Sequence, residues 1–421
     1  MKRSFKRNAL RINVKGILKW LYPGIGIKRW ILLVLFGLVF IIIGSFFLRN
    51  EEFVLFQVLD SIGLLCGIII LILGIKGIIR FFINAEVPSS KSNELVDIVF
   101  QRKQLSRGPR IVAIGGGTGL SVLLSGLKQY TSNITAIVTV ADDGGSSGRL
   151  RQEFDILPPG DIRNCLVALA DAPTLMRDLF QFRFDTNSEL GGHSFGNLFI
   201  TVMTRLTGDF EKAIKETSKV LALKGQVIPS TLNNVQLVAQ HKDGSTTVGE
   251  ASITSARRPI NSVSLQPDKP TATPDAIKAI EEAQVIVLGP GSLYTSIVPN
   301  LLIKEITDSI AASHAIKVYV CNVMTQPGET DGFSVSDHIK VLVNHSHARV
   351  LDYCVINSGE ISKEMFDRYR MQNSLPVIND KKKIESIGYR VIEDDFVATD
   401  DVIRHDPGKL ARIILGLLDE I

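Results

Sequence analysis

Residues Arg110–Gly119 read RIVAIGGGTG and continue into the apolar run Leu120–Leu124. A β-branched run that ends in glycines before an apolar segment predicts a buried strand, a tight turn and a helix N-terminus. Glycines let a ligand approach the backbone, and the unpaired N–H groups of a helix's first turn favour an anion. The sequence therefore predicts a phosphate-binding turn, with a glycine turn that holds no ligand as the alternative.

Neither of the two common glycine motifs fits this turn. A P-loop would end in Gly-Lys-Ser/Thr, whereas Gly119 is followed by Leu120 and Ser121. The dinucleotide fingerprint needs a third glycine, and Leu120 or Val122 stands at that position. The turn belongs to neither class.

Two apolar segments near the N-terminus predict a membrane hairpin. Trp30–Leu48 is 19 residues without a charge, long enough to cross a bilayer, and a second apolar stretch runs from about Leu55 to Ile75. Residues 1–29 contain nine Lys or Arg and no acid, so the positive-inside rule places both chain ends in the cytoplasm. We expect, in order, a basic cytoplasmic arm that contacts membrane lipid (1–29), a hairpin of two transmembrane helices (30–83), a linker (84–107) and a globular domain (108–421).

Charge and cysteine content exclude several classes of function. The whole chain has a net charge of +4 and residues 30–85 are neutral, so residues 86–421 carry −5. An acidic domain is not a general nucleic-acid binder. The four cysteines are widely spaced and form no CxxC or Cys/His pattern, which predicts neither disulfides nor structural zinc.

The remaining apolar runs predict an α/β domain. Short, non-alternating β-branched segments that read as buried parallel strands lie at 111–114, 134–140, 285–288, 318–323 and 353–357. Helical patterns separate them, so we expect a Rossmann-like, doubly wound, mainly parallel sheet. Residues 236–262 and the short run 263–265 alternate instead, which predicts a small antiparallel insertion.

The loop after the second strand, ADDGGSSGRLR, carries candidate ligand groups. Asp142 and Asp143 can coordinate a hard metal or accept hydrogen bonds from a sugar, and Arg149 can bind phosphate. Ser146 and Ser147 add hydroxyl groups. Ligands of open α/β sheets bind beyond the carboxyl ends of strands, so we expect this loop beside the first glycine turn.

Two further segments precede helices. In PPGDIRN, Asp161 can cap the following helix, while Arg163 and Asn164 can reach a ligand. In GHSFGNL, His193 and Asn197 lie before an apolar helix, and a lone histidine of this kind is most often structural. No Gly-x-Ser-x-Gly elbow is present, which gives a serine hydrolase no support.

Another glycine loop, GPGSLYTS, follows the strand at 285–288. Ser292 is a good helix cap, and Tyr294 can stack on a base or a sugar. The segment NVMTQPGET then places amide, hydroxyl and carboxylate groups beyond the next strand. Five polar, glycine-bearing loops at strand ends are hard to explain by structure alone.

Taken in order, these loops resemble the CofD-like superfamily, and most of all its YvcK branch, the gluconeogenesis factors. The resemblance covers about residues 108–417. It implies a Rossmann-like fold whose cleft binds a nucleotide-linked ligand, in this branch a UDP-sugar such as UDP-N-acetylglucosamine. It also implies a role in cell shape, cell-wall synthesis and growth on gluconeogenic carbon. The hairpin departs from the soluble family pattern and predicts a cell-membrane location.

When the family's site residues are carried over to the matching positions of this sequence, the resemblance implies a non-catalytic ligand site. Its residues are Gly115, Gly116, Gly117, Thr118, Gly119, Asp142, Asp143, Ser146, Ser147, Arg149, Asn164, Asn197, Gly289, Gly291, Ser292, Tyr294 and Thr295. The sibling branch, 2-phospho-L-lactate transferase, moves a phospholactyl group with Mg²⁺, which Asp142 and Asp143 would bind here. The shared loops do not separate a transferase from a ligand-binding regulator. The other partners that we expect are a cell-wall synthesis protein, for which the domain can act as a scaffold, and a second copy of the chain.

Overall fold

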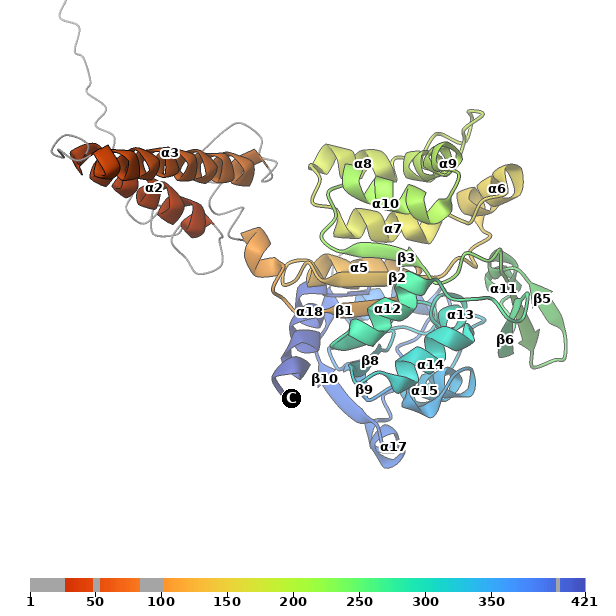
Figure 1. Cartoon of the computed structure of the whole chain (residues 1–421). Coiled ribbons are helices and arrows are strands. Elements are labelled where there is room, and N and C mark those ends of the chain that lie inside the picture. The colour runs from red at the N-terminus through yellow and green to blue at the C-terminus, as the bar shows by residue number, and fades with distance from the viewer. Residues whose placement is uncertain (1–26, 48–53, 84–100, 399–401, 421) are drawn as a thin grey trace, which may run out of the picture. The chain divides into compact units, whose positions relative to one another are not determined.

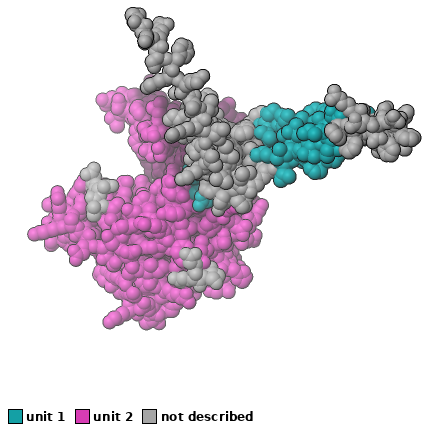
Figure 2. Space-filling view, turned by 90° about the vertical axis from the view of Figure 1, so that its left-hand side faces the viewer, with its two compact units in different colours: residues 1–106 teal, residues 107–421 magenta. Residues whose placement is uncertain are grey.

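The computed structural model describes residues 27–47, 54–83, 101–398 and 402–420. The chain divides into two compact units, residues 1–106 and 107–421, which Figure 2 colours separately. The predicted basic arm up to residue 26 and most of the predicted linker lie outside the described residues.

The described part of the first unit contains a helical hairpin. Helices α2 (Ile27–Phe47) and α3 (Val54–Ile83) pack against each other, with glycines at the contact. A Cβ atom at Gly37 would lie 2.8 Å from the backbone nitrogen of Leu71, so glycine allows the two backbones to approach. The outward side chains are apolar: Leu32, Ile42 and other large residues are exposed.

The exterior of this hairpin is typical of helices that contact lipid, since a water-exposed helix usually has a polar face. Among the described residues, the segment Ser61–Ile79 is long and apolar enough to cross a membrane, whereas the apolar part of α2, Arg29–Ser45, is shorter than the usual span. The structure therefore shows a helical hairpin at the predicted place, and its crossing of a membrane stays a prediction.

A seven-stranded parallel sheet forms the centre of the second unit (Figure 1). Its order is β10-β9-β8-β7-β1-β2-β3. The strands are β1 (Ile111–Gly115), β2 (Ile134–Val138), β3 (Gln226–Pro229), β7 (Val285–Leu288), β8 (Ile316–Val320), β9 (Tyr353–Asn357) and β10 (Arg390–Asp394). The predicted α/β class and its five strands are confirmed, and the two strands that sequence reasoning missed, β3 and β10, are the sheet's edges.

Helices cover the sheet and alternate with its strands. They are α5 (Gly117–Leu127), α6 (Gly145–Phe154), α7 (Gly160–Leu169), α8 (Thr174–Gln181), α9 (Phe195–Thr207), α10 (Phe210–Val220), α12 (Pro274–Glu282), α13 (Val298–Leu301), α14 (Lys304–Ala312), α15 (Val335–Asn344), α16 (Lys363–Arg370), α17 (Lys381–Ser386) and α18 (Pro407–Gly416), with short turns η1 (Leu293–Ile297), η2 (Ala348–Val350) and η3 (Leu417–Glu420). Figure 1 shows α7–α10 gathered as a helical layer beside the β2–β3 end of the sheet.

Two small antiparallel elements stand apart from the main sheet. The predicted insertion is present as β4 (Gln236–His241), β5 (Thr246–Val248) and β6 (Ile260–Gln266), with α11 (Glu250–Ala256) between them. A second pair, β11 (Val397–Ala398) and β12 (Arg404–His405), lies near the C-terminus.

The order of the strands locates the candidate site. The chain first builds β1, β2 and β3 in one direction and later adds β7 to β10 on the other side of β1. The loops that follow β1 and β7 therefore leave their strands in opposite directions and open a crevice between them. Ligands of doubly wound folds bind at such a switch point.

The close packing of α5 on α18 gives a test of the fold. A Cβ atom at Gly126 would overlap the carbonyl oxygen of Pro407, whereas a Cβ at Gly416 would meet nothing within 4 Å. We expect Gly126→Ala to destabilise the chain by about 1–3 kcal/mol. The matched variant Gly416→Ala should be neutral or stabilising by up to about 1 kcal/mol. Urea unfolding measures the free energy of unfolding of both variants, and equal changes in the two would contradict the close packing of α5 on α18.

Candidate functional site

The glycine turn after β1 begins α5 without a side-chain cap. Gly117 has a φ of +64°, a conformation that favours glycine. A Cβ at Gly119 would lie 2.6 Å from the carbonyl oxygen of Pro290, so a larger residue there would push two loops apart. The Gly117 N–H is bonded to the Asp161 carboxyl, so the N–H groups of Thr118 and Gly119 are the ones available for a ligand at the switch point.

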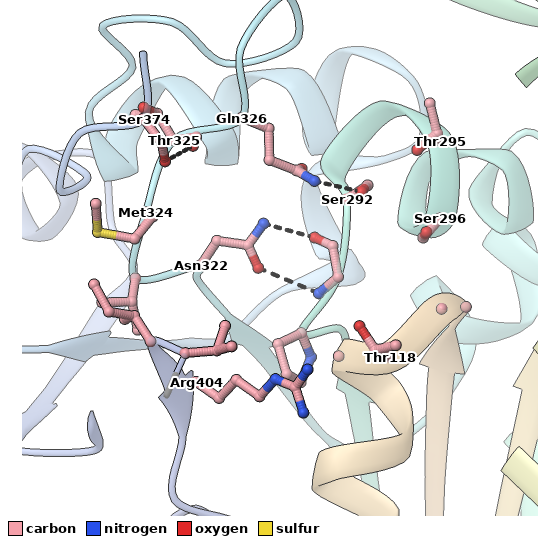
Figure 3. A pocket seen from close by; sticks show the side chains of 18 of the residues that line it. Thr118, Ser292, Thr295, Ser296, Asn322, Met324, Thr325, Gln326, Ser374 and Arg404 are labelled. Carbon is pink, nitrogen blue, oxygen red and sulfur yellow. Dashed lines mark hydrogen bonds between the residues drawn. The ribbon is translucent and has the colours of Figure 1, made fainter. Parts of the chain in front are cut away.

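The loop after β7 is held in place by amide side chains from the segment after β8 (Figure 3). The Nδ2 atom of Asn322 donates to the carbonyl oxygen of Gly291 at 2.8 Å, and the Gly291 N–H donates back to Oδ1 at 3.3 Å. The Nε2 atom of Gln326 donates to the Ser292 hydroxyl at 2.6 Å. The polar groups of the NVMTQPGET segment thus fix the shape of the second glycine loop.

A cavity of 890 Å³ lies between these loops. The sequence-predicted residues that line it are Gly116, Gly117, Thr118, Gly119, Asp142, Gly291, Ser292 and Thr295. Arg404, from β12, extends toward the glycine turn that carries Thr118 (Figure 3). Loops that are far apart in the sequence therefore share one cavity.

Four other predicted residues line a smaller, neighbouring cavity of 170 Å³: Ser146, Ser147, Asn164 and Asn197. Asp142 and Asp161 line both cavities and stand between them. Most of the 17 residues that were predicted to bind the ligand line one of these two cavities, but not all of them do.

Gly115 and Gly289 are not among the lining residues. The Gly289 N–H donates to the carbonyl oxygen of Ile114 at 2.9 Å, and the Gly115 carbonyl accepts from the Thr139 N–H at 3.0 Å. These two glycines join neighbouring strands just below the loops, so their role in this structure is to position the ligand-facing residues.

Tyr294 and Asp143 also lie outside both cavities, for different reasons. Tyr294 is 2% exposed, and its ring packs edge-on against His345, so it is not placed to stack on a base in the large cavity. The Asp143 carboxylate accepts from the Ala251 N–H at 2.9 Å in the first turn of α11. Its position favours helix capping over the predicted metal binding.

Arg149 does not line either of the two cavities. Its Nη2 atom donates to the carbonyl oxygen of Gly191 at 2.7 Å, on the loop before α9. The neighbouring Arg151 is buried and donates to the carbonyl oxygen of Val235. Both arginines hold loops together in this structure, whereas phosphate binding was predicted for Arg149.

Carboxyl groups at the site have raised pKa values. Burial, and then the charge of Asp142, raise the pKa of Asp161 to about 7, although the Gly117 N–H lowers it. Burial and nearby acids likewise raise the pKa of Glu250 to about 7, and burial raises that of Glu329 to about 7. Near neutral pH, these groups can therefore both donate and accept hydrogen bonds.

Several lining residues were not predicted as site residues. Asp161 was interpreted mainly as a helix cap, yet α7 begins at Gly160 and the carboxylate lies against Gly116. Glu250 comes from helix α11 of the antiparallel insertion, and Arg404 comes from the two-residue strand β12. Neither segment follows a strand of the main sheet, so no strand-end signal marks them.

Comparisons with known proteins identify the family of this chain. The family model described as 2-phospho-L-lactate transferase CofD matches residues 111–397. A relative from Nostoc sp. is 46% identical over 418 residues, which cover 94% of this chain and 91% of its own length. The gluconeogenesis factor of Bacillus subtilis is 48% identical over 317 residues, which cover 75% of this chain and all of its own length.

A solved structure shows the same fold. The X-ray structure of a Bacillus halodurans protein, whose family is designated UPF0052, has a TM-score of 0.72 and 47% identity. The match covers 73% of this chain and 100% of that protein. The match to the Nostoc relative, in contrast, covers so much of this chain that it must include most of the N-terminal unit.

The pKa of Asp161 predicts how the stability depends on pH. An aspartate that titrates near 4 when unfolded and near 7 when folded binds more protons in the folded state between these values. The wild type therefore loses stability as the pH rises from about 4 to about 7. Asp161→Asn removes this loss, so its stability relative to the wild type should increase across that window and level off above it.

Urea unfolding at several pH values measures this difference. The exposed Asp178 on α8 offers a matched control, because Asp178→Asn removes a carboxylate that lines neither cavity. If the free energies of unfolding of Asp161→Asn and the wild type differ by a constant amount from pH 4 to pH 7, folding does not shift the pKa of Asp161.

Proposed function

The chain belongs to the CofD family, in the group of the gluconeogenesis factors, and on this basis we propose that it binds a nucleotide sugar of the UDP-N-acetylglucosamine type as a regulator. The observation that carries the proposal is the 890 Å³ cavity between the glycine turn of α5 and the Gly291 loop. A cavity of this size suits a ligand larger than a single phosphate.

One part of the cavity is suited to a diphosphate. The N-terminus of α5 offers the N–H groups of Thr118 and Gly119, and the Thr118, Ser292 and Ser296 hydroxyls surround the same space. Arg404 and Arg257, which both line the cavity, supply positive charge. Helix N-termini and guanidinium groups are the usual partners of phosphate oxygens in proteins.

The remaining walls are suited to a sugar and a base. Asp142, Asp161 and Glu250 line the cavity, and the two with raised pKa values, Asp161 and Glu250, can both donate to and accept from sugar hydroxyls. Tyr369 and Met324 line the cavity too and offer apolar surface to a base. The Tyr369 hydroxyl accepts from the Ile403 N–H at 3.0 Å, which fixes the ring beside the strand that carries Arg404.

The alternative is a Mg²⁺-dependent transferase of a phospholactyl-type group, which the description of the matching family model favours. Among the described residues, no three His, Cys, Asp or Glu side chains are grouped so that they could hold an ion. Magnesium is often bound by one or two carboxylates together with substrate phosphates and water. Asp142 and Asp161 fit that role, and such an ion would neutralise phosphate charge. Asp143, which caps α11, does not fit it.

We further propose that the hairpin anchors the domain to the cell membrane on its cytoplasmic side. The apolar exterior of α2 and α3 and the nine basic residues of 1–29 support this placement. A membrane-bound sensor of a cell-wall precursor would act near the enzymes of wall synthesis, consistent with a role in cell shape. A wall-synthesis protein is the partner that this arrangement suggests.

Calorimetry with UDP-N-acetylglucosamine tests the proposed ligand. Arg404→Ala removes a charge-assisted contact to phosphate, so we expect the affinity to fall about 10- to 100-fold. Arg412→Ala removes an exposed arginine of α18 that does not line the cavity and should leave the affinity unchanged. Equal affinities of the two variants, or no binding by the wild type, would contradict the proposal.

Mass spectrometry of the same mixtures, with Mg²⁺ added, separates the two functions. A regulator returns the nucleotide sugar unchanged. A new product that forms only with the wild type would favour the transferase.

Membrane fractionation tests the anchor. We expect the full chain to stay with membranes after an alkaline carbonate wash, and a variant that lacks residues 1–83 to be released. Release of the full chain by the wash would contradict a membrane-spanning hairpin. Protease added to intact spheroplasts should spare the globular domain if that domain faces the cytoplasm.

A further inference from the structure

The 170 Å³ cavity beside the nucleotide-sugar site has the features of an anion site. It lies where α6 begins, with walls from α7, α9 and the segment after α8. Helix α6 has ten residues and starts at Gly145 without a side-chain cap. Its first N–H groups therefore point toward the start of the helix, where negative charge is favoured.

Arg163 is the main cation in the wall of this cavity. It is 7% exposed, and its guanidinium donates to the Ser194 hydroxyl and to Oδ1 of Asn164. Its Nε atom is buried without a hydrogen-bond partner in the described part of the chain. A buried donor without a partner is costly, so its presence at a cavity points to a ligand that completes the bond.

A second guanidinium, that of Arg183, lines the same cavity. Burial, and then the charge of Arg183, lower the pKa of Arg163 to about 10. Neither arginine forms an ion pair within 4.0 Å with a carboxylate of the described residues. Two guanidinium groups at one cavity are a common arrangement at phosphate sites, and here Asp142 and Asp161 line the same cavity and partly offset their charge.

The cavity also presents hydrogen-bond acceptors. Asn197 is 2% exposed and donates through Nδ2 to the Ser146 hydroxyl at 3.0 Å, while its Oδ1 is buried without a partner in the described part of the chain. Asp142, which lines both cavities, adds a carboxylate acceptor, while the neighbouring Asp161 can itself carry a proton because burial raises its pKa to about 7. An anion in this cavity would therefore need a proton of its own to satisfy these acceptors.

We propose that this cavity is a second oxyanion subsite, built for a phosphate group that carries a proton. Inorganic phosphate and phosphate monoesters meet this requirement near neutral pH, whereas sulfate carries no proton and would leave the acceptors unsatisfied. The phosphate comes either from a separate small molecule or from a second phosphate of the ligand in the large cavity. The inference stands on these contacts and does not depend on the identity of that ligand.

Calorimetric titration of the full chain in detergent tests the subsite, with inorganic phosphate and sulfate as the probes. We expect phosphate to bind at least tenfold more tightly than sulfate. Arg183→Gln should weaken phosphate binding about tenfold or more, because the exposed Arg183 contributes charge without supporting the core. Arg349→Gln, which removes an exposed arginine of η2 that lines neither cavity, is the matched control.

Repeating the phosphate titration with saturating UDP-N-acetylglucosamine identifies the source of the phosphate. If the affinity for phosphate is unchanged, the phosphate comes from a separate molecule. If UDP-N-acetylglucosamine displaces the phosphate whose binding depends on Arg183, the subsite belongs to the nucleotide-linked ligand. Absence of phosphate binding, equal binding by Arg183→Gln, or equal affinity for sulfate would overturn the proposal. Arg183-dependent phosphate binding in a chain that does not bind UDP-N-acetylglucosamine would instead overturn the proposed function alone.

Discussion

The contact between two glycine loops at the centre of the parallel sheet is the constraint on which the site depends. Gly119 comes so close to Pro290 that a side chain would separate the loops, and the Gly289 N–H bonds to the strand that ends in the first loop. This contact sets the width of the crevice between the two halves of the sheet. The N-terminus of α5, the Gly291 loop and Arg404 then share one cavity because their supporting strands are held together at this point.

Much of this arrangement could be predicted from the sequence. The buried strands β1, β2, β7 and β9 are short runs rich in β-branched residues, and few structures other than a buried strand fit such runs. Each run is bounded by glycine or polar residues. The edge strand β10 could not be predicted in this way, because RVIED is half-exposed and resembles a surface segment. The carboxyl ends of parallel strands share one edge of the sheet, so strand positions alone are enough to place the loops that begin at residues 115 and 289 together.

The parts of the site that the sequence did not predict depend on long-range packing. Tyr294 stands in a ligand-like motif, but the turn η1 directs its ring into the core beside His345. Arg404 reaches the cavity only because the chain returns in a two-residue strand after β10. The pairing of Asp161 with the glycine turn likewise needs α7 to pack on α5, which no local pattern specifies. The separation of two residues in the sequence does not predict such long-range contacts.

We expect the crevice between the two glycine loops to hold the diphosphate of a nucleotide sugar. The position of the phosphorus atoms in a crystal structure with UDP-N-acetylglucosamine measures this most directly. Both phosphates are expected within hydrogen-bond distance of the backbone N–H groups of Thr118 and Gly119 and of the Arg404 guanidinium. Ordered ligand on another face of the domain, with that crevice empty, would contradict it.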